Sequence, residues 1–234
     1  MITDFHSHIL PGIDDGSSCV EESIAMLKKQ AQQGITHVVA TPHFYANYQS
    51  TEEFLEKRNR AEAKLREEMK NHPGLPTLSV GAEVYFFKGI SQSTALEVLT
   101  IDQKNYIIIE MLGSPWTESA YRELEDIYSG QGLTPIVAHV DRYLGFWQDY
   151  GIPKRLSQLP VLVQANASFF TNRFTVAKAC RELKRGRIHL LGSDCHNLTT
   201  RPPNLDLAIA SIVNRVGEEP IRQIKANEQL VLDL

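Results

Sequence analysis

Two histidines stand one residue apart near the start of the sequence, in the segment Thr3–Ser18, which reads TDFHSHILPGIDDGSS. In an extended strand alternate side chains point to the same face, so His6 and His8 would point to one spot. Imidazole nitrogens that converge in this way suit a metal ion, and Asp14 and Asp15 follow close behind. A lone His-x-His pair also occurs by chance on half-buried strands. The rest of the chain must therefore show whether these two histidines are metal ligands.

Potential metal ligands also follow most of the apolar, strand-length runs that recur along the chain. The runs predicted to be strands are Ile2–Phe5, Thr36–Ala40, Thr77–Gly81, Tyr106–Ile109, Pro135–Ala138, Val161–Ala165 and Ile188–Gly192. Parallel α/β folds place their chemistry at the carboxyl ends of strands, and six of these seven runs are closely followed by His, Asp or Glu. The candidate ligands are His6, His8, Asp15, His43, Glu83, Glu110, His139, Asp194 and His196. Imidazoles and carboxylates that converge on one dry edge are unstable without cations, so the set predicts a metal centre.

The number and type of these ligands indicate which ions would bind. Five histidines and four carboxylates are too many for one ion and suit two or three divalent ions. A nitrogen and oxygen set without thiolate favours Mn²⁺, Fe²⁺ or Zn²⁺ over Ca²⁺. Such ions would attract an anion, and phosphate is the obvious candidate. Arg142 follows His139 by three residues and Arg201 follows His196 by five, and guanidinium groups match a phosphoryl group in paired hydrogen bonds.

These candidates need a scaffold of alternating strands and helices. The strand-length runs alternate with amphipathic, helix-length segments, which is typical of βα units around a parallel sheet. An eightfold barrel usually takes about 250 residues, so 234 residues favour a smaller, distorted seven-stranded (β/α)7 barrel, one domain over residues 1–234. The later helices are predicted at Thr117–Ser129, Tyr143–Ser157, Asn172–Arg185 and Leu205–Val216, with one more near the C-terminus.

The first two helices carry their own boundary signals. Ser18 with Glu21, and Ser50 with Glu53, have the spacing of a capping box, in which each side chain pairs with a free amide at a helix start. Gly34 suits the position just after the end of the first helix. Both helices would therefore begin at defined residues, and the first would also end at one.

Composition excludes several classes of function. A formal net charge of −4 gives no general attraction to nucleic acid or to an anionic membrane. No run approaches the roughly 18 apolar residues of a membrane span, and the N-terminus lacks the pattern of a signal peptide. Cys19, Cys180 and Cys195 are an odd number and lie far apart, which argues against a disulfide framework. We therefore expect a cytoplasmic protein.

Five segments, in this order and at these spacings, resemble one known group of proteins. They read DFHSHILPGIDDGS, TPHF, GAEVYF, AHVDRY and GSDCHN followed by RPP, and the match runs from near residue 2 to Pro203. The chain is similar to the bacterial polymerase-and-histidinol-phosphatase (PHP) superfamily, and within it to the metal-dependent protein tyrosine phosphatases of capsule and exopolysaccharide operons. The resemblance implies a distorted seven-stranded barrel that holds three metal ions, usually manganese.

The resemblance also implies a role for each candidate residue. One ion would be held by His6, His8, Glu83 and Asp194, a second by Glu83, Glu110 and His139, and a third by Asp15, His43 and His196. The second aspartate of the DDG step is the ligand in the family, which favours Asp15 over Asp14. Arg142 and Arg201 fall on the two arginines that bind phosphate there. Asp141, where the family often has Glu, is a departure that touches no ligand.

The implied activity is hydrolysis of phosphotyrosine, on the phosphorylated tyrosine-rich tail of a bacterial tyrosine kinase that controls polysaccharide synthesis. Hydroxide activated by the metal would attack phosphorus in line, and phenolate would leave readily because its pKa is about 10. Histidinol-phosphate phosphatase and other PHP phosphoesterases are the main alternatives. A DNA exonuclease would need a basic track that the charge does not supply. The oligomeric state is open, a homo-oligomer included.

Two further interpretations belong to other classes. Cys195 and Arg201 have the C-x5-R spacing of cysteine-dependent phosphatases, but no glycine lies between them and Pro202 follows. A non-catalytic, metal-stabilised module is the other alternative. The aromatic segment Phe44–Phe54, FYANYQSTEEF, either shapes the mouth of the site or joins the core, and the core is favoured. His37, His72 and His189 lie away from the strand ends and are predicted to be structural.

Overall fold

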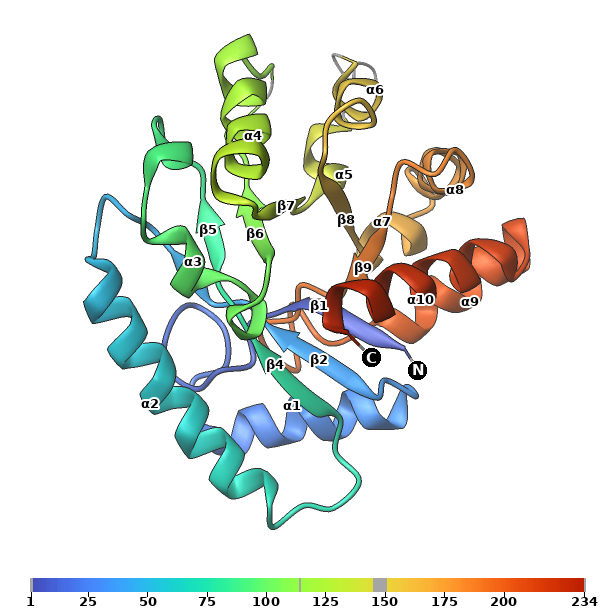
Figure 1. The fold of residues 1–234 in the computed structure, drawn as a ribbon. Coiled ribbons are helices and arrows are strands. Elements are labelled where there is room, and N and C mark those ends of the chain that lie inside the picture. Colours follow the sequence, from blue (N-terminus) through green and yellow to red (C-terminus); the bar gives the residue numbers. More distant parts are fainter. Residues whose placement is uncertain (1, 114, 145–150, 234) are drawn as a thin grey trace.

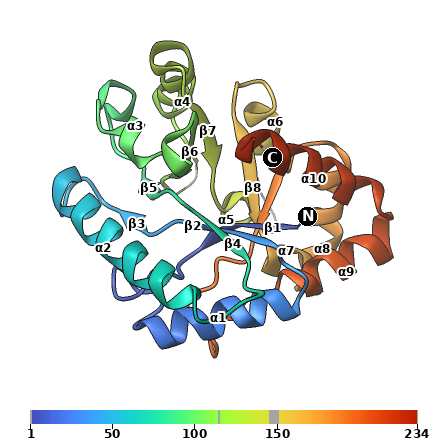
Figure 2. The same ribbon diagram turned by 60° about the horizontal axis from the view of Figure 1, so that its bottom comes forward.

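Parallel strands form the centre of the molecule, and helices lie around the outside (Figures 1 and 2). The computed structural model describes residues 2–113, 115–144 and 151–233. Its strands are β1 (Thr3–Ser7), β2 (His37–Ala40), β3 (His43–Phe44), β4 (Thr77–Val80), β5 (Glu83–Tyr85), β6 (Tyr106–Glu110), β7 (Thr134–Val137), β8 (Leu162–Asn166) and β9 (Leu190–Gly192). All the paired strands run parallel, so their carboxyl ends meet at one edge.

The strands make two sheets that follow one curved surface. One has the order β1-β2-β4 and the other the order β3-β5-β6-β7-β8-β9. A parallel bridge between Ser7 and Cys195 connects β1 to the segment after β9. The predicted parallel α/β architecture is confirmed, in the form of a curled sheet, whereas nine strands are present among the described residues where seven were predicted. Two predicted strands are followed by short strands that the sequence did not indicate. Two residues separate β2 from β3, and two residues separate β4 from β5.

Helices connect most of the strands. They are α1 (Val20–Gln32), α2 (Thr51–Met69), α3 (Leu96–Leu99), α4 (Glu118–Gln131), α5 (Val140–Tyr143), α6 (Ile152–Leu156), α7 (Ala167–Thr171), α8 (Val176–Lys184), α9 (Leu205–Val216) and α10 (Glu219–Leu232), with 3₁₀ turns at Ile90–Gln92 and Ile101–Gln103. The prediction of one helix over Tyr143–Ser157 is wrong, because α5 ends where that helix should begin. Only α6 falls inside the predicted range, and residues 145–150 lie outside the described residues.

One of the two predicted capping boxes is present. The Ser50 side chain accepts a hydrogen bond from the Glu53 amide at 3.2 Å, and the Glu53 carboxylate accepts one from the Ser50 amide at 3.1 Å. The Ser18 box is wrong: α1 begins one residue later, and the Ser18 amide and hydroxyl both donate to Glu22 Oε2. Gly34 directly follows Gln33, the C-cap residue of α1, and has the positive φ expected there.

Two apolar cores hold the strands in place. The larger core packs strands against the surrounding helices and includes Phe54 and Leu65 of α2. The smaller core joins residues of several strands to the C-terminal end of α10; it comprises Phe5, Val39, Ile101, Ile108, Ile136, Ala138, Leu190, Val231 and Leu232. Polar candidate ligands lie beyond the carboxyl ends of the same strands. No helix among the described residues is long and apolar enough to cross a membrane.

A buried carboxyl group joins α10 to β1 and gives a first prediction. The Thr3 amide donates to Glu228 Oε2 at 3.2 Å, and burial raises the pKa of Glu228 to about 7. The pKa of this carboxyl is higher in the folded than in the unfolded protein. Its contribution to stability is therefore fully present below its ordinary pKa and is lost as pH rises through about 7. Glu228→Gln keeps a hydrogen-bond acceptor but carries no charge. The free energy of unfolding of the variant minus that of wild type should therefore increase by about 2 kcal/mol from pH 5 to pH 8.

Urea unfolding at the two pH values, with chelator present, measures this difference. Glu219→Gln is the matched control, because Glu219 lies on the same helix and is exposed. A difference in free energy of unfolding between Glu228→Gln and wild type that is the same at both pH values would contradict the raised pKa of Glu228.

Candidate metal centre

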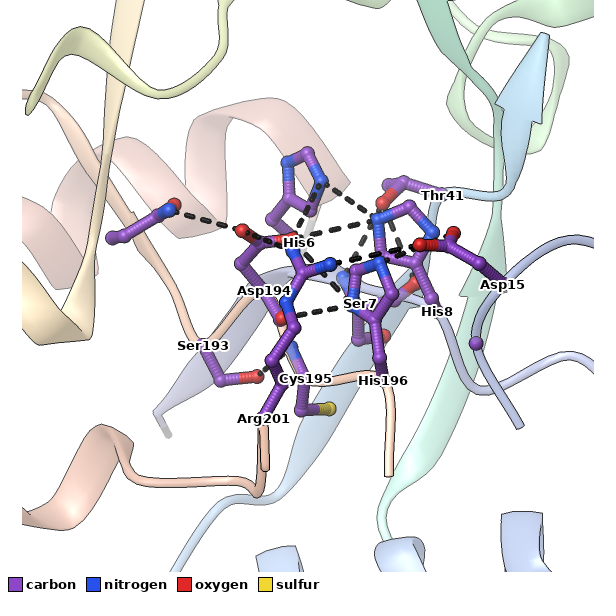
Figure 3. Close-up of polar contacts among 12 residues, drawn as sticks. His6, Ser7, His8, Asp15, Thr41, Ser193, Asp194, Cys195, His196 and Arg201 are labelled. Atoms are coloured by element: carbon purple, nitrogen blue, oxygen red, sulfur yellow. Dashed lines mark hydrogen bonds and ion pairs between the residues drawn. The ribbon is translucent and has the colours of Figure 1, made fainter. Parts of the chain in front are cut away.

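The structure brings all nine predicted ligands to one place at the carboxyl ends of the strands. Figure 3 shows five of them, His6, His8, Asp15, Asp194 and His196. Within the described residues, four groups of side chains present ligand atoms that lie within 4.8 Å of one another. The groups are His8, Asp15, His43 and His196; His6, His8 and Asp194; His6, Glu83 and His139; and His43, Glu83 and Glu110. Together the four groups contain the nine candidates and no other described residue.

Glu83, the first residue of β5, lies at the centre of this cluster and is fully buried. Its Oε1 is 2.6 Å from His139 Nε2. Its Oε2 is 2.9 Å from His43 Nδ1, 3.2 Å from His6 Nε2 and 3.4 Å from His8 Nε2. One carboxylate therefore faces four imidazoles from three different segments of the chain, which suits a residue that is shared between ions.

Asp194 connects the cluster to the two arginines. Its Oδ2 accepts a hydrogen bond from Arg201 Nη2 at 2.8 Å and lies 3.7 Å from Arg142 Nη2 (Figure 3 shows Arg201). Arg142 also pairs with Glu110. The side chains of Arg142 and Arg201 are 43% and 38% exposed, whereas that of Asp194 is 8% exposed. Both guanidinium groups thus lie at the solvent side of the cluster, where they can reach a bound anion.

Asp15 and Asp14 have different environments. Asp15 is exposed, and its Oδ1 lies 3.4 Å from Nε2 of both His43 and His196. Asp14 instead lies 2.7 Å from His8 Nδ1 and accepts hydrogen bonds from the amides of Gly16 and His43. The position of Asp15 agrees with its choice as the candidate ligand.

Asp14 and Asn166 orient two of the imidazoles, a role that the sequence did not indicate. Asn166 Oδ1 is 3.0 Å from His139 Nδ1, and the Asn166 amide nitrogen donates to Asp194 Oδ2 at 3.1 Å. A group that accepts from one ring nitrogen fixes the tautomer and leaves the other nitrogen free for a metal. The available signal in the sequence was weak. Asp14 adjoins the candidate ligand Asp15, and Asn166 follows the one predicted strand run of seven that lacks a candidate ligand at its end.

This arrangement predicts the effect of Asp14→Asn. The amide removes the charge that holds the His8 ring, so metal affinity should fall about 10- to 100-fold while the fold persists. Titration of the metal-free protein with Mn²⁺ by calorimetry measures the change. Asp126→Asn, on α4, is a control away from the cluster. An unchanged affinity for Asp14→Asn would contradict the orienting role.

Burial and charge act against each other at the ligand side chains. Burial alone would raise the pKa of Glu83 and Asp194, but the neighbouring imidazoles hold both pKa values well below the ordinary range. Burial would lower the pKa of His8 and His139, yet Asp14 for His8 and Glu83 for His139 raise them. Burial does lower the pKa of His6 to about 4. Protons on some imidazoles thus balance the carboxylates where cations would otherwise do so, and metal binding would release these protons.

The backbone is strained at two of the candidates. His139 and Asp194 have φ angles of 53° and 55°, in the left-handed region that non-glycine residues rarely adopt. Hydrogen bonds hold both peptides, from the His139 amide to Gln164 Oε1 and from the Asp194 amide to the His6 carbonyl. At Gly192 a Cβ would lie 2.4 Å from the His6 Cβ, so only glycine lets β9 approach β1 this closely. Such strain is typical of functional sites.

Three ligand atoms of the cluster are buried without a hydrogen-bond partner among the described residues. They are Glu83 Oε2, Asp194 Oδ1 and His196 Nε2. A buried carboxylate oxygen without a donor is costly, and a cation would satisfy it. The orphaned atoms and the mixed nitrogen and oxygen set therefore fit divalent ions.

The other histidines have structural partners, as predicted. His37 lies between the hydroxyls of Thr77 and Ser79, at 2.6 and 2.8 Å. His72 contacts the Glu68 carboxylate, and His189 Nδ1 accepts from the Val163 amide. None of the three belongs to the four groups.

Residues 2–232 match the protein family described as "Capsular polysaccharide synthesis, CpsB/CapC". The chain belongs to the CpsB/CapC family. It is 28% identical to tyrosine-protein phosphatase CpsB of Streptococcus pneumoniae, over 94% of this chain and 93% of that protein. It is 29% identical to the putative tyrosine-protein phosphatase CapC of Staphylococcus aureus, over 99% and 91% of the two chains. These CpsB/CapC relatives match the chain nearly from end to end.

A solved structure supports the fold assignment within the CpsB/CapC family. The crystal structure belongs to a study of YwqE from Bacillus subtilis and CpsB from Streptococcus pneumoniae, described as unique metal-dependent tyrosine phosphatases. The match has a TM-score of 0.82 at 22% identity and covers 99% of this chain and 95% of the other. At this identity the likeness establishes the common fold.

Proposed function

We propose that this chain is a metal-dependent protein tyrosine phosphatase that hydrolyses phosphotyrosine. The observation that carries the proposal is the convergence of nine ligand side chains with two half-exposed arginines at one edge of the sheet. Several CpsB/CapC relatives are named tyrosine-protein phosphatases, which supports the same activity. The preferred substrate is the phosphorylated, tyrosine-rich tail of a bacterial tyrosine kinase that controls capsular or exopolysaccharide synthesis.

Three divalent ions, with Mn²⁺ preferred to Fe²⁺ or Zn²⁺, are the proposed cofactors. The sets implied by the family resemblance overlap with the observed groups, because His6, His8 and Asp194 lie together, as do Asp15, His43 and His196. Glu83 belongs to two of the groups, which supports a shared ligand. Ions bound there supply Lewis acidity and lower the pKa of water towards neutrality.

The chain itself contributes orientation and charge. Arg142 and Arg201 approach the cluster from its solvent side, so they would bind the phosphoryl oxygens and orient phosphorus towards the ions. A tyrosine leaving group needs little protonation, because its pKa is about 10. This is consistent with a cluster in which every histidine is already a ligand candidate.

The fold details and cell biology that go with this function are proposals too. We infer that β2 with β3, and β4 with β5, are two interrupted strands of a seven-stranded (β/α)7 barrel that forms one domain over residues 1–234. A cytoplasmic location and a possible homo-oligomer complete the proposal. Neither nucleic acid nor membrane insertion has a part in it.

A cysteine mechanism is disfavoured by the position of Cys195. The thiol is completely buried and lies 3.8 Å from Gln30 Nε2 of α1, and burial raises its pKa well above the ordinary value. A thiol that stays protonated is a poor nucleophile. Cys195→Ser should therefore keep kcat/KM within about threefold, whereas loss of all activity in a variant that folds and binds metal would favour the cysteine mechanism.

One assay tests the proposed function against its rivals. Purified protein is incubated with Mn²⁺ and either a phosphotyrosine peptide or histidinol phosphate, before and after chelation, and released phosphate is measured. We expect higher kcat/KM for the peptide, loss of activity with chelator and recovery with Mn²⁺. Preference for histidinol phosphate would favour the other phosphoesterase class. No release from any substrate would favour a non-catalytic module.

A further inference from the structure

Three tyrosines beside the metal cluster have no part in the ligand set. The ring centre of Tyr45 lies 5.3 Å from that of His43, 5.6 Å from that of Tyr85 and 6.1 Å from that of Tyr48. We call Tyr45, Tyr48 and Tyr85 the tyrosine platform. Tyr45 is its centre, because it contacts both other tyrosines and the candidate ligand.

Strand geometry explains why the platform adjoins the site. β3 pairs with β5 in parallel, with His43 opposite Glu83. Tyr45 and Tyr85 each come two residues after one of these ligands, and alternate residues of an extended segment point to the same side. Tyr85 is also opposite Glu110 in the pairing with β6. The two rings therefore lie one step further along the strands than the ligands, in the direction that leads out of the site.

The segment Phe44–Phe54 also contributes to the core. The aromatic residues near the site are therefore of two kinds. Phe44 and Phe54 are buried and contact each other at 5.1 Å between ring centres. Tyr45 and Tyr85 are only partly buried, and Tyr48 is 87% exposed. The phenylalanines thus explain the packing of the segment, whereas core packing does not explain the exposed tyrosine ring next to a polar site.

We propose that the tyrosine platform contacts the phenyl ring of a phosphotyrosine substrate and so selects aryl over alkyl phosphates. The inference rests on the proposed phosphatase function and adds a specificity determinant to it. Aromatic rings attract each other at centre distances of about 4.5–7 Å, in stacked or edge-to-face arrangements. A substrate whose phosphoryl group binds at the cations and arginines has its ring attached directly outside them, beside residues that follow the ligands by two positions.

Substitutions of Tyr45 and Tyr48 test this inference. Tyr45→Ala should lower kcat/KM for a phosphotyrosine peptide about tenfold, mainly through a higher KM, and Tyr48→Ala should have a smaller effect of the same kind. Tyr45→Phe keeps the ring and should retain most of the activity. Inorganic phosphate has no ring, so its inhibition constant should stay within about twofold in all three variants. Tyr128→Ala, a half-exposed tyrosine on α4, is the matched control.

The possible outcomes separate this inference from the function on which it rests. Wild-type protein that fails to hydrolyse the phosphotyrosine peptide would overturn both. An active wild type with an unchanged KM in Tyr45→Ala and Tyr48→Ala would overturn only the platform. Equal losses of peptide hydrolysis and phosphate inhibition would also overturn it, because they would show that Tyr45 supports the metal cluster. Circular dichroism and metal content of each variant confirm that the fold and the cluster persist.

Discussion

Replacement of Glu83 by glutamine should lower kcat/KM for a phosphotyrosine peptide by about a thousandfold. Glu83 is fully buried, and its two oxygens face four imidazoles at 2.6 to 3.4 Å. The amide has nearly the same shape but carries no charge. Two of the four ligand groups thus lose a carboxylate in one step, and the group of His6 and His139 loses the one that it has. Removing one partner from a buried charged cluster typically costs several kcal/mol, which accounts for a loss of this size.

Metal content is the measurement that links this loss to the proposed role. Glu83→Gln, loaded with Mn²⁺ and freed of excess ions, should contain fewer ions per chain than wild type by elemental analysis. Glu182→Gln is the matched control, because Glu182 is also buried and paired, with Arg185 and Arg187, but lies on α8 outside the cluster. It should lose stability and keep its metal. Full metal content and more than about a tenth of wild-type activity in Glu83→Gln would contradict the shared-ligand role.

The ligand set could be predicted from sequence because buried strands rarely end in charged residues without a reason. Glu110 follows three isoleucines, and a carboxylate at the end of such a run must find a cation or a donor. Parallel strands then bring their carboxyl ends together. Residue type and strand order were enough to select eight of the nine residues that the structure groups together, and the family resemblance selected Asp15 over Asp14.

Grouping of the ligands required three-dimensional information. His8 belongs to the group of Asp15 as well as to that of Asp194, and no sequence spacing distinguishes these neighbours. Asp14 and Asp15 are adjacent acids of the same type. Only the turn after His8 shows that Asp14 faces the His8 Nδ1 and that Asp15 faces the two outer histidines.

The missed elements are short or interrupted. β3 has two residues and β5 has three, so neither shows the alternation that identifies a strand. α6 begins after Gly151, which has a φ of 70°, with Pro153 in its first turn. Proline near a helix start is a recognised signal, and it could have placed this boundary within the predicted helix.

Arg201 and Arg142 are the second place where a single substitution should have a large effect. Arg201→Ala should lower kcat/KM for the phosphotyrosine peptide by about a hundredfold to a thousandfold, and Arg142→Ala by a similar factor, because each removes donors to the phosphoryl oxygens. Both guanidinium groups face Asp194 Oδ2, and ions bound beside Asp194 would compete for that oxygen. The arginines would then be free to turn towards substrate.

Lysine variants separate charge from geometry. Arg201→Lys keeps the positive charge but loses the paired donors, so it should recover only part of the activity. Arg155→Lys is the matched control, since the Arg155 side chain is 45% exposed and pairs with Glu118 on the surface. Metal content should be unchanged in all of these variants, in contrast to Glu83→Gln. An Arg201→Lys enzyme with kcat/KM within about twofold of wild type would show that this side chain balances the charge of Asp194 without binding the phosphoryl group.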